Sequence, residues 1–349
     1  MKIIHVEGGL GNQMACYAVY VAAKRGNPDE EIFIDTYLYD ITEAHGTISM
    51  WNGYELGKVF GIEIPDIRSL FSPEEIEEQL NYLRKSEFWK HGWNYDVEFI
   101  RVMEKYGIYL KNAYGNVGEN LENKGEMRVA LKRLLRKYGA KTADTYFAYE
   151  LKRFLHVINK KINKDCGEYL LKSRDGNFFY NITLDFMKST GLQGIIGDDV
   201  RKGLTFKEPT DKRNIEYLEL INKFNSISIH IRRTDYLEFN EDCYKYGYFL
   251  SSIQYIKKVI KDPVFFIFSD DLPWCKEHTK QIGFAEDDKI YFVDINVEEN
   301  SYRDMQLMSS CKHNISTKSS FGWWAGFLNT NPQKITVCQT GSYVSTVQF

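Results

Sequence analysis

The chain has 349 residues, of which 43% are hydrophobic, 27% charged and 15% aromatic, a composition that excludes disordered, collagen-like and fibrous proteins. Because a single hydrophobic core usually stops growing at about 250–300 residues, we expect two globular domains. The 45 basic and 48 acidic side chains give a net charge of -3, which argues against nucleic acid as a partner.

The six cysteines lie far apart, without a C-x-x-C pair or the spacing of a zinc site or disulfide framework. This pattern predicts free thiols in a reducing compartment. Glu7 interrupts the N-terminal apolar stretch, and no later run reaches the roughly 18 residues that a membrane span requires. We therefore expect a cytoplasmic protein.

The chain begins with the pattern of a strand, a glycine turn and a helix. Residues 3–6 are apolar, Gly8-Gly9-Leu10-Gly11 follows, and apolar side chains then recur at helical spacing from Met14. A second buried strand is expected at residues 32–35, parallel to the first. Further on, Ser72-Pro73-Glu74-Glu75 combines an N-cap, a first-turn proline and a glutamate at the third helical position, which predicts a helix start.

The first domain, residues 1–213, is predicted to carry a basic helical insertion at about residues 101–176. Between Arg101 and Lys164 there are 15 Lys or Arg residues and 6 Asp or Glu residues. Two interpretations stay open. The insertion is either a solvated helix face or a surface for an anionic membrane or phosphorylated acceptor, where a polybasic helix gains ~1 kcal/mol per basic residue.

The second domain is predicted over residues 214–349, after a polar stretch at residues 209–213. Strands and helices alternate in it, which predicts an open parallel sheet with crossover helices. Ligands of such sheets bind at the carboxyl ends of the strands, so polar residues directly after a strand are candidate site residues. The expected strands are 227–231, 264–268, 290–293, the neighbourhood of 315, and 335–338, and the expected helices lie near 251–260 and 302–311.

Four polar clusters follow predicted strands, and all suit a nucleotide diphosphate. In the first, Gly8-Gly9-Leu10-Gly11-Asn12-Gln13, backbone amides could approach an anion at a helix N-terminus. The motif is neither G-x-G-x-x-G nor a P-loop, so a purely structural turn is the alternative.

The second cluster is His230-Ile231-Arg232-Arg233-Thr234-Asp235, and strand alternation aims His230 and Arg232 to one side. An arginine fork binds phosphate bidentately and can replace a divalent metal in stabilising a leaving diphosphate. The alternative is that Arg233 pairs with Asp235 and only shapes the turn.

The third cluster contains Asp270 and Asp271. A carboxylate at a strand end can accept two hydrogen bonds from the N1 and N2 edge of guanine. The alternatives are a Mg²⁺ ligand and an N-cap for a helix beginning near Pro273.

The fourth cluster runs from Asp304 to Leu328 and includes a predicted helix start at Ser319 and Ser320. Hydroxyls and backbone amides at a helix start bind phosphate well. We interpret the adjacent Trp323 and Trp324 as structural.

The four clusters, in this order, resemble the α-1,2-fucosyltransferases of glycosyltransferase family 11 over nearly the whole chain. The resemblance implies an α/β, GT-B-like fold, in which two Rossmann-like domains face each other across a cleft. It implies that the first domain is on the acceptor side and that the second binds a GDP-sugar. The implied reaction is inverting transfer of L-fucose from GDP-β-L-fucose to the 2-hydroxyl of a terminal β-galactoside, without a metal or other cofactor.

The resemblance also implies a bacterial, cytoplasmic enzyme of O-antigen or oligosaccharide synthesis. Its acceptor would be a galactose-terminated oligosaccharide or a lipid-linked glycan. The basic insertion would then give peripheral contact with the inner face of the membrane.

By position, the resemblance assigns donor-binding roles to residues of both domains. Arg232 would hold the β-phosphate and act as a catalytic residue. His230 and Asp270 would contact the guanosine, and Ser319 and Ser320 the diphosphate. Gly11 and Asn12 would contact the donor from the first domain. Lys318 stands where family members usually carry asparagine. Asp235 is named as the general base, with Glu238 and Glu7 as alternatives.

Several rival functions remain open. Because the H-x-R-R-x-D motif also resembles that of α-1,6-fucosyltransferases, the linkage could differ, and so could the GDP-sugar. The non-enzyme alternative is a module that binds a GDP-sugar without turnover. A Mg²⁺-dependent GT-A enzyme is the remaining alternative.

Overall fold

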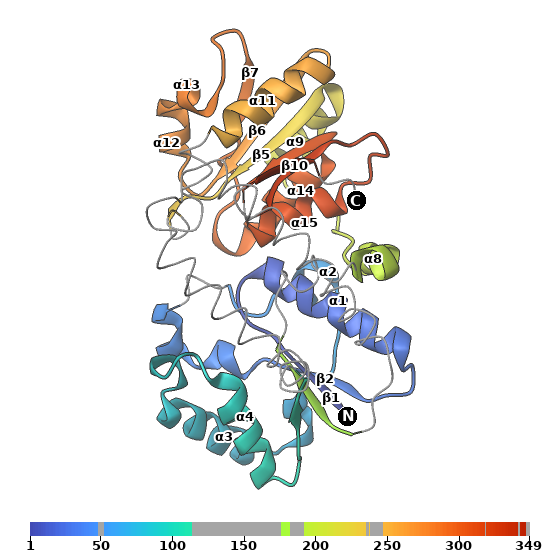
Figure 1. Ribbon diagram of the computed structural model, residues 1–349, viewed down its shortest axis with the longest axis vertical. Helices are drawn as coiled ribbons and strands as arrows, with labels where there is room; N and C mark the ends of the chain where they lie inside the picture. The colour runs from blue at the N-terminus through green and yellow to red at the C-terminus, as the bar shows by residue number, and fades with distance from the viewer. Residues whose placement is uncertain are drawn as a thin grey trace, which may run out of the picture. The chain divides into compact units, whose positions relative to one another are not determined.

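The structure is a computed structural model that describes residues 1–47, 52–113, 176–181, 192–234, 237, 247–317, 319–340 and 343–346. The chain divides into two compact units, Met1–Gly203 and Leu204–Phe349. The division falls before residues 209–213, the polar stretch at which the sequence predicted it. Each unit contains its own sheet (Figure 1).

The first unit contains a four-stranded parallel sheet of order β2-β1-β4-β3. β1 (Lys2–His5) leads through the glycine turn into α1 (Leu10–Gly26), and the chain returns as β2 (Ile32–Asp35), as predicted. The sheet is completed by β3 (Lys111–Asn112) and β4 (Phe178–Tyr180). The remaining helical elements are α2 (Leu56–Phe60), α3 (Pro73–Ser86), α4 (Tyr95–Lys105), α8 (Leu192–Gly203) and the 3₁₀ turns η1 (Tyr37–Asp40), η2 (Thr42–Thr47), η3 (Ile67–Leu70) and η4 (Phe88–Lys90).

The start of α3 confirms the predicted capping box. The Ser72 side chain accepts from the N–H of Glu75, and the Glu75 carboxylate accepts from the N–H of Ser72. These bonds satisfy two N–H groups that would otherwise lack partners at the helix start.

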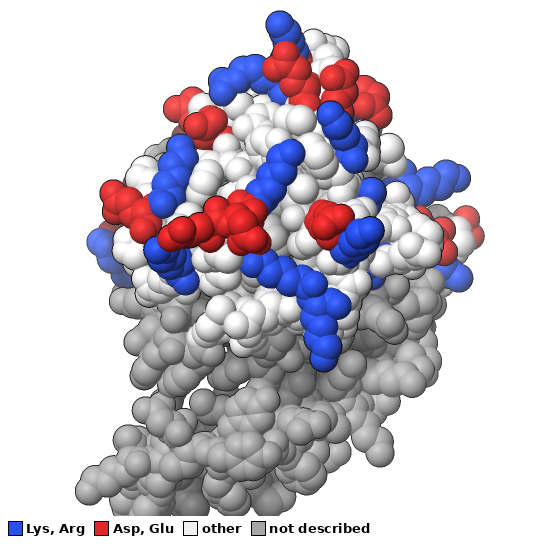
Figure 2. All heavy atoms as spheres, turned by 90° about the horizontal axis from the view of Figure 1, so that it is seen from above, with Lys and Arg blue, Asp and Glu red and all other residues white. Residues whose placement is uncertain are grey.

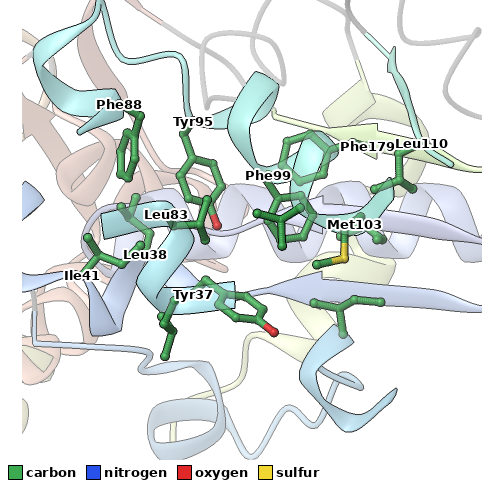
Figure 3. Packing of buried hydrophobic residues seen from close by; sticks show 14 of the residues in the cluster. Tyr37, Leu38, Ile41, Leu83, Phe88, Tyr95, Phe99, Met103, Leu110 and Phe179 are labelled. Atoms are coloured by element: carbon green, nitrogen blue, oxygen red, sulfur yellow. The ribbon is translucent and has the colours of Figure 1, made fainter. Parts of the chain in front are cut away.

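Aromatic side chains of α4 and β4 lie in a large hydrophobic cluster of the first unit (Figure 3). The rings of Phe99 and Phe179 stack at 4.9 Å, and Tyr95 stacks on Phe99 at 5.8 Å. Each such buried side chain contributes roughly 1.5–3 kcal/mol relative to exposure. This packing fixes the position of Tyr95 against the ends of β1 and β2.

The second unit contains a six-stranded sheet of order β10-β9-β8-β5-β6-β7. Its parallel strands are β5 (Asn225–Ile231), β6 (Pro263–Ser269), β7 (Lys289–Phe292), β8 (His313–Ser316) and β9 (Thr336–Thr340), and β10 (Tyr343–Thr346) pairs antiparallel with β9. If the parallel strands β5 to β9 are numbered 1 to 5 along the chain, their order across the sheet is 3-2-1-4-5, which is that of a Rossmann sheet. The predicted α/β class with two Rossmann-like units is confirmed.

Helices connect these strands, and the two faces of β5 differ in character. Ile229 belongs to an apolar cluster with Phe249 of α11, whereas the alternate residues Ser228 and His230 point to the opposite face. There the ring of His230 lies 5.7 Å from that of Phe321 in α15. The helical elements of this unit are α9 (Lys212–Lys223), α11 (Tyr248–Val259), α12 (Leu272–Glu277), α13 (Thr279–Ile282), η6 (Glu298–Asn300), α14 (Tyr302–Ser310) and α15 (Ser320–Leu328).

The predicted strands and helices of the second domain are all present at nearly the predicted positions. Residues 114–175, most of the predicted basic insertion, lie outside the described residues. On the face shown in Figure 2, basic and acidic side chains are interspersed rather than gathered by sign.

Candidate functional site

The strand order of the second sheet reverses between β5 and β8, which makes their carboxyl ends the switch point where Rossmann-type sheets bind ligands. The two strands pair with His230 opposite Ser316. Beyond the pairing, the N–H of Thr317 donates to the carbonyl of His230 (3.2 Å), and the N–H of Arg232 donates to Oγ1 of Thr317 (3.4 Å). The segments after both strands are therefore held together.

Helix α15 starts directly at this switch point. Ser319 is its N-cap, but the Ser319 hydroxyl accepts no capping hydrogen bond from the helix. Ser319 and Ser320 are both half-buried. The first N–H groups of a helix lack intrahelical partners and carry roughly half a positive charge. This end of α15 is therefore suited to an anion.

His230 is a buried and neutral histidine beside that helix start. Its side chain Nδ1 has no hydrogen-bond partner among the described residues, and the residue is only 7% exposed. Burial lowers the pKa of His230 to about 4, and the charge of Arg232 lowers it as well, against a raising effect of Asp270. A Cβ at Gly322 of α15 would lie 2.7 Å from this Nδ1, so only glycine allows the close approach.

The two arginines after β5 have different surroundings. The Arg233 side chain is 13% exposed; its Nε donates to Asp271 (3.0 Å), and its guanidinium lies 3.6 Å from the ring of Trp274. The Arg232 side chain is 34% exposed, with Nη1 3.4 Å from Asp270. Arg232 thus presents the more accessible guanidinium, while Arg233 packs within the second unit.

Asp270 and Asp271 also separate into two roles. Asp271 is the N-cap of α12 and accepts from the N–H of Trp274 (3.2 Å), which confirms that one of the pair serves as a cap. Asp270 accepts from the N–H groups of Arg233 (2.8 Å) and Thr234 (3.1 Å). The Asp270 carboxylate therefore orders the loop that carries the arginines.

The glycine turn of the first unit is held rigidly by Gln13. Its amide donates to the carbonyls of Gly8 (3.1 Å) and Gly53 (2.8 Å) and accepts from the N–H of Glu55 (2.8 Å). Gly8 has φ of +77°, a conformation that favours glycine. Gly11 and Asn12 lie in the first turn of α1.

Some predicted residues are not among those the structure describes: Asp235, Glu238 and Lys318 lie outside them. Trp323 and Trp324 are described and are both buried, with ring centroids 5.0 Å apart. Their interpretation as structural residues is confirmed.

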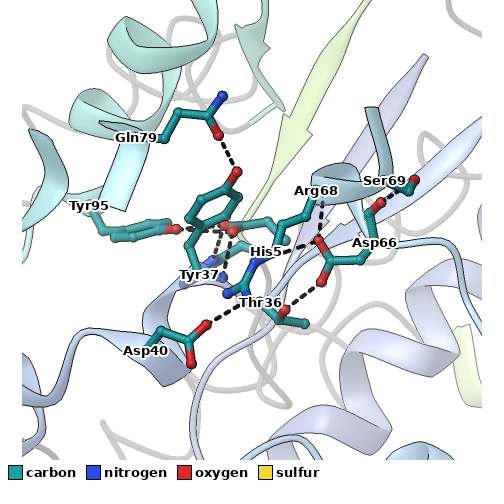
Figure 4. A network of polar contacts seen from close by, with 10 residues as sticks. His5, Thr36, Tyr37, Asp40, Asp66, Arg68, Ser69, Gln79 and Tyr95 are labelled. Carbon is teal, nitrogen blue, oxygen red and sulfur yellow. Dashed lines mark hydrogen bonds and ion pairs between the residues drawn. The ribbon is translucent and has the colours of Figure 1, made fainter. Parts of the chain in front are cut away.

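Sequence reasoning missed the charged network at the end of β1. His5 pairs in register with Asp35 of β2, and its Nδ1 lies 2.7 Å from the Asp35 carboxylate, which also accepts from the Tyr95 hydroxyl at 2.9 and 3.0 Å (Figure 4). Nε2 of His5 lies 3.4 Å from Glu7. Burial lowers the pKa of His5, but the bonds and charges of Asp35 and Glu7 outweigh it and raise that pKa to about 9. The available signal was that Glu7 stands two residues after His5, the spacing that brings side chains of an extended chain to the same side.

Asp304, the first residue of the fourth cluster, lies in the first turn of α14 and accepts from the amide of Asn296 (2.8 Å). Burial raises the pKa of Asp304 to about 7, against the lowering effect of that hydrogen bond. Asn296 in turn exchanges hydrogen bonds with Asn214 of α9. Asn296 therefore links Asp304 of α14 to Asn214 of α9 by hydrogen bonds.

Within the described ranges, no group of three or more His, Cys, Asp or Glu side chains is arranged to hold a metal ion. No helix in the part of the chain that the structure describes has the length and apolar content to span a membrane. The cysteines described, Cys16, Cys275, Cys311 and Cys338, are buried, and the first three are free thiols.

The sequence model of glycosyl transferase family 11 matches residues 166–346, more than half of the chain and all of the strand ends described above for the second unit. The chain belongs to glycosyl transferase family 11. The part of the match within the described residues includes β5, β8 and α15, so the switch point lies in the family's shared region.

Three relatives of the chain match shorter segments of it. An Escherichia coli α-1,2-colitosyltransferase is 38% identical over 130 residues, 36% of this chain and 43% of the relative. The O-antigen biosynthesis glycosyltransferase WbnK of Escherichia coli is 40% identical over 119 residues, 32% of this chain and 37% of the relative. Mouse galactoside α-(1,2)-fucosyltransferase 1 is 30% identical over 107 residues, 29% and 27% of the two chains. The aligned segments thus span less than half of each relative.

Among solved structures, the fucosyltransferase NodZ from Bradyrhizobium aligns with a TM-score of 0.47 and 10% sequence identity, over 99% of this chain and 98% of NodZ.

Proposed function

We propose that this family 11 chain is an inverting, metal-independent fucosyltransferase that transfers L-fucose from GDP-β-L-fucose to the 2-hydroxyl of a terminal β-galactoside. One observation carries the proposal. At the switch point of the second unit, the backbone N–H of Arg232 is bonded to Thr317, two residues before the N-cap of α15, and the neutral His230 packs against Phe321 in the first turn of the same helix.

In this proposal the donor diphosphate binds at the start of α15. The hydroxyls of Ser319 and Ser320 and the first-turn N–H groups donate to phosphate oxygens, and the helix end contributes its partial positive charge. Arg232 adds a full charge and up to two parallel hydrogen bonds. His230 adds no second positive charge to this site, because its low pKa keeps the imidazole neutral at pH 7.

The guanosine is proposed to bind beside His230 and Asp270. Oδ1 of Asp270 accepts one hydrogen bond from the Arg233 N–H, and an ionised carboxylate oxygen can accept more than one. The N1 and N2 donors of guanine would use that remaining capacity. Asp270 would then couple base recognition to the loop that carries Arg232.

In the proposed reaction the acceptor hydroxyl attacks C1 of fucose from the face opposite GDP. The bond from C1 to the β-phosphate oxygen breaks, and its electron pair leaves with GDP. Negative charge therefore grows on the β-phosphate, where the guanidinium of Arg232 donates hydrogen bonds. A preorganised donor of this kind is worth about 10²- to 10³-fold in rate.

Support for the 2-linkage and for the donor sugar comes from the relatives. Two of them, the colitosyltransferase and the mouse fucosyltransferase, carry α-1,2 specificity in their names. A second candidate donor is a colitosyl nucleotide, because the colitosyltransferase is 38% identical over its aligned segment. Both donors leave the role of Arg232 unchanged.

The proposed acceptor is a galactose-terminated oligosaccharide or lipid-linked glycan, in line with the O-antigen role in the name of WbnK. Contact of the basic insertion, residues 101–176, with the cytoplasmic face of a membrane would bring the chain to a lipid-linked acceptor. The contacts of Gly11 and Asn12 with the donor, the cleft between the domains and the role of Asp235 stay predictions.

An acceptor screen with GDP-fucose tests this proposal. The chain is incubated with GDP-fucose, a panel of galactosides and EDTA, and the linkage of any product is determined by NMR. The expected product is an α-linked fucose on the 2-hydroxyl of galactose, formed at the same rate with and without EDTA. An α-1,6 product, loss of activity in EDTA, or GDP binding without transfer would each contradict a stated part of it.

A further inference from the structure

Trp274 is an aromatic residue beside the loop that carries the two arginines. It lies in α12, the helix that follows β6, and it is half-buried. Cζ of Arg233 lies 3.6 Å from the centre of its ring, well within the ~6 Å over which a cation and an aromatic ring attract each other. Arg233 and Trp274 are therefore in direct contact, although they follow different strands of the sheet.

Asp271 links the same two residues through separate oxygens. Its Oδ2 accepts from Nε of Arg233 at 3.0 Å, and its Oδ1 accepts from the N–H of Trp274 at 3.2 Å. The N–H of Asp271 donates to the hydroxyl of Ser269, at the end of β6, at 3.0 Å. The Arg233 side chain is 13% exposed, so its contact with the indole is largely shielded from water. Cation–π attraction is stronger in such desolvated settings.

The indole is held in place by its own helix. The ring of His278, the C-cap of α12, stacks on it with 4.5 Å between ring centres and 12° between the planes. Nδ1 of His278 donates to the carbonyl of Trp274 at 2.8 Å, and the backbone N–H of His278 donates to the same carbonyl at 3.0 Å. With Asp271 at one end of α12 and His278 at the other, the helix presents the ring to Arg233 in a fixed orientation.

A fixed Arg233 in turn fixes the segment that displays Arg232. The N–H groups of Arg233 and Thr234 donate to the carboxylate of Asp270, and Nη1 of Arg232 lies 3.4 Å from the same carboxylate. The Arg232 side chain is 34% exposed, against 13% for its neighbour. A movement of Arg233 would therefore shift both the backbone of Arg232 and the carboxylate beside its guanidinium.

We propose that Trp274 is a positioning residue of the donor site: its indole holds Arg233, and through Arg233 it sets the direction in which Arg232 meets the diphosphate. The proposal rests on the part of the proposed function in which Arg232 binds the donor diphosphate. Trp274 itself touches neither the nucleotide nor the sugar. The residues involved all belong to the second unit.

The Kd of GDP in four proteins tests this role. Calorimetry compares the wild type, Trp274→Leu, Arg232→Ala and the double variant. Leucine is apolar but offers no ring face to a guanidinium. Because a largely desolvated cation–π contact is worth roughly 5- to 30-fold in an equilibrium constant, Trp274→Leu should weaken GDP binding by about that factor. In the Arg232→Ala background the same change should alter the Kd by less than about twofold, since the residue through which Trp274 acts is gone.

Two further variants distinguish positioning from general packing. Trp274→Phe keeps an aromatic face and should bind GDP within about threefold of the wild type. The matched control is Phe224→Leu, because Phe224 is also half-buried in the second unit, with Nζ of Lys289 3.9 Å from its ring centre. Phe224 precedes the first residue of β5 and so lies at the opposite end of that strand from the arginines. Phe224→Leu should keep wild-type GDP affinity even where it lowers the thermal unfolding midpoint as much as Trp274→Leu does.

Arg233→Lys tests the same contact from the other side and serves if Trp274→Leu does not fold. Lysine keeps the positive charge but loses the flat guanidinium that stacks on the ring. Arg233→Lys should therefore weaken GDP binding in the wild-type background, and by less than about twofold in the Arg232→Ala background. Wild-type GDP affinity in Arg233→Lys would overturn the role of the stacked pair.

The outcomes separate this proposal from the proposed function. If the wild type binds GDP and transfers fucose, and Trp274→Leu does both within about twofold of it, the positioning role is overturned and the fucosyltransferase function stands. An equal loss of GDP affinity from Trp274→Leu with and without Arg232 also overturns the role, because the indole would then act independently of that arginine. If the wild type binds GDP but transfers no sugar from any GDP-sugar, the proposed function is overturned and the four Kd values still decide the role of Trp274. A wild type that binds no GDP overturns both.

Discussion

Gly322 in α15 offers a sharp test of the packing at the switch point. A Cβ at this position would lie 2.3 Å from Oγ of Ser316 and 2.7 Å from Nδ1 of His230, well inside van der Waals contact. Neither neighbour can swing away easily, because both are buried and the Ser316 hydroxyl donates to the carbonyl of Thr317 at 2.8 Å. Gly322→Ala must therefore displace the end of β5, the end of β8 or the start of α15.

The size of the effect follows from this overlap. Forcing an extra methyl group into a packed site costs about 1–3 kcal/mol. If the displacement must be reversed for GDP to bind, the same energy appears as a roughly 5- to 150-fold loss of affinity, since 1.4 kcal/mol is about tenfold. The unfolding midpoint should also fall, by about 2–4 °C per kcal/mol for a domain of 150–250 residues.

The assay compares thermal unfolding and GDP titration for the wild type, Gly322→Ala and a control. Gly57→Ala in α2 is the matched control, because its Cβ would meet only the carbonyl of Ile62 at 3.6 Å, an ordinary contact. It should unfold at or above the wild-type midpoint, given the ~1 kcal/mol advantage of alanine over glycine in helices. Wild-type stability and GDP affinity in Gly322→Ala would refute the packing argument, and lower stability with unchanged affinity would remove His230 from the GDP site.

Three further predictions follow from other parts of the structure. Arg232→Ala should lower kcat by about 10²- to 10³-fold, with Arg232→Lys in between, and initial rates at saturating donor would contradict this if Arg232→Ala stayed within threefold of the wild type. Gln13→Ala removes three hydrogen bonds around the glycine turn, so it should lower the unfolding free energy by at least about 2 kcal/mol in urea titrations; no change would show that the turn is held by other contacts. The pKa of His5 is raised in the folded state to about 9, from 6.5, so its contribution to stability, on the order of 3 kcal/mol, is complete below pH 6.5 and is lost as the pH rises through 9. That loss should be absent in His5→Asn, and equal pH dependence of unfolding in both proteins would count against the charged network.

Local patterns in the sequence were enough to predict much of the fold. The Ser72 capping box, the glycine turn after β1 and the alternation through β5 act over a few residues, and each lies where it was predicted. The strand order of the second sheet depends on which strands pair, which no local pattern encodes. β4 is a three-residue strand far along the chain from its partner β1, and it had no local signal strong enough to be predicted.

The sequence predicted which residues lie at the candidate site but not what each of them does there. The sequence placed two arginines and two aspartates after neighbouring strands. The division of labour among them depends on side-chain directions: Arg233 packs on Trp274, and Asp271 caps α12. The need for glycine at position 322 also appears only when α15 lies against His230.

The His5 network shows the same limit for the first unit. His5, Asp35 and Tyr95 are separated by 30 and 60 residues, and only the pairing of β1 with β2 and the packing of α4 bring them together. A histidine at the end of a short strand and a glutamate two residues later are a weak signal without those partners.

A crystal structure of the chain with GDP bound is the most direct test of the central claim that the switch point of the second unit is the donor site. The account predicts that the diphosphate lies against the first turn of α15, with the Arg232 guanidinium donating to the β-phosphate and no bridging metal ion. A nucleotide bound away from β5 and α15, or held through a divalent cation, would contradict it.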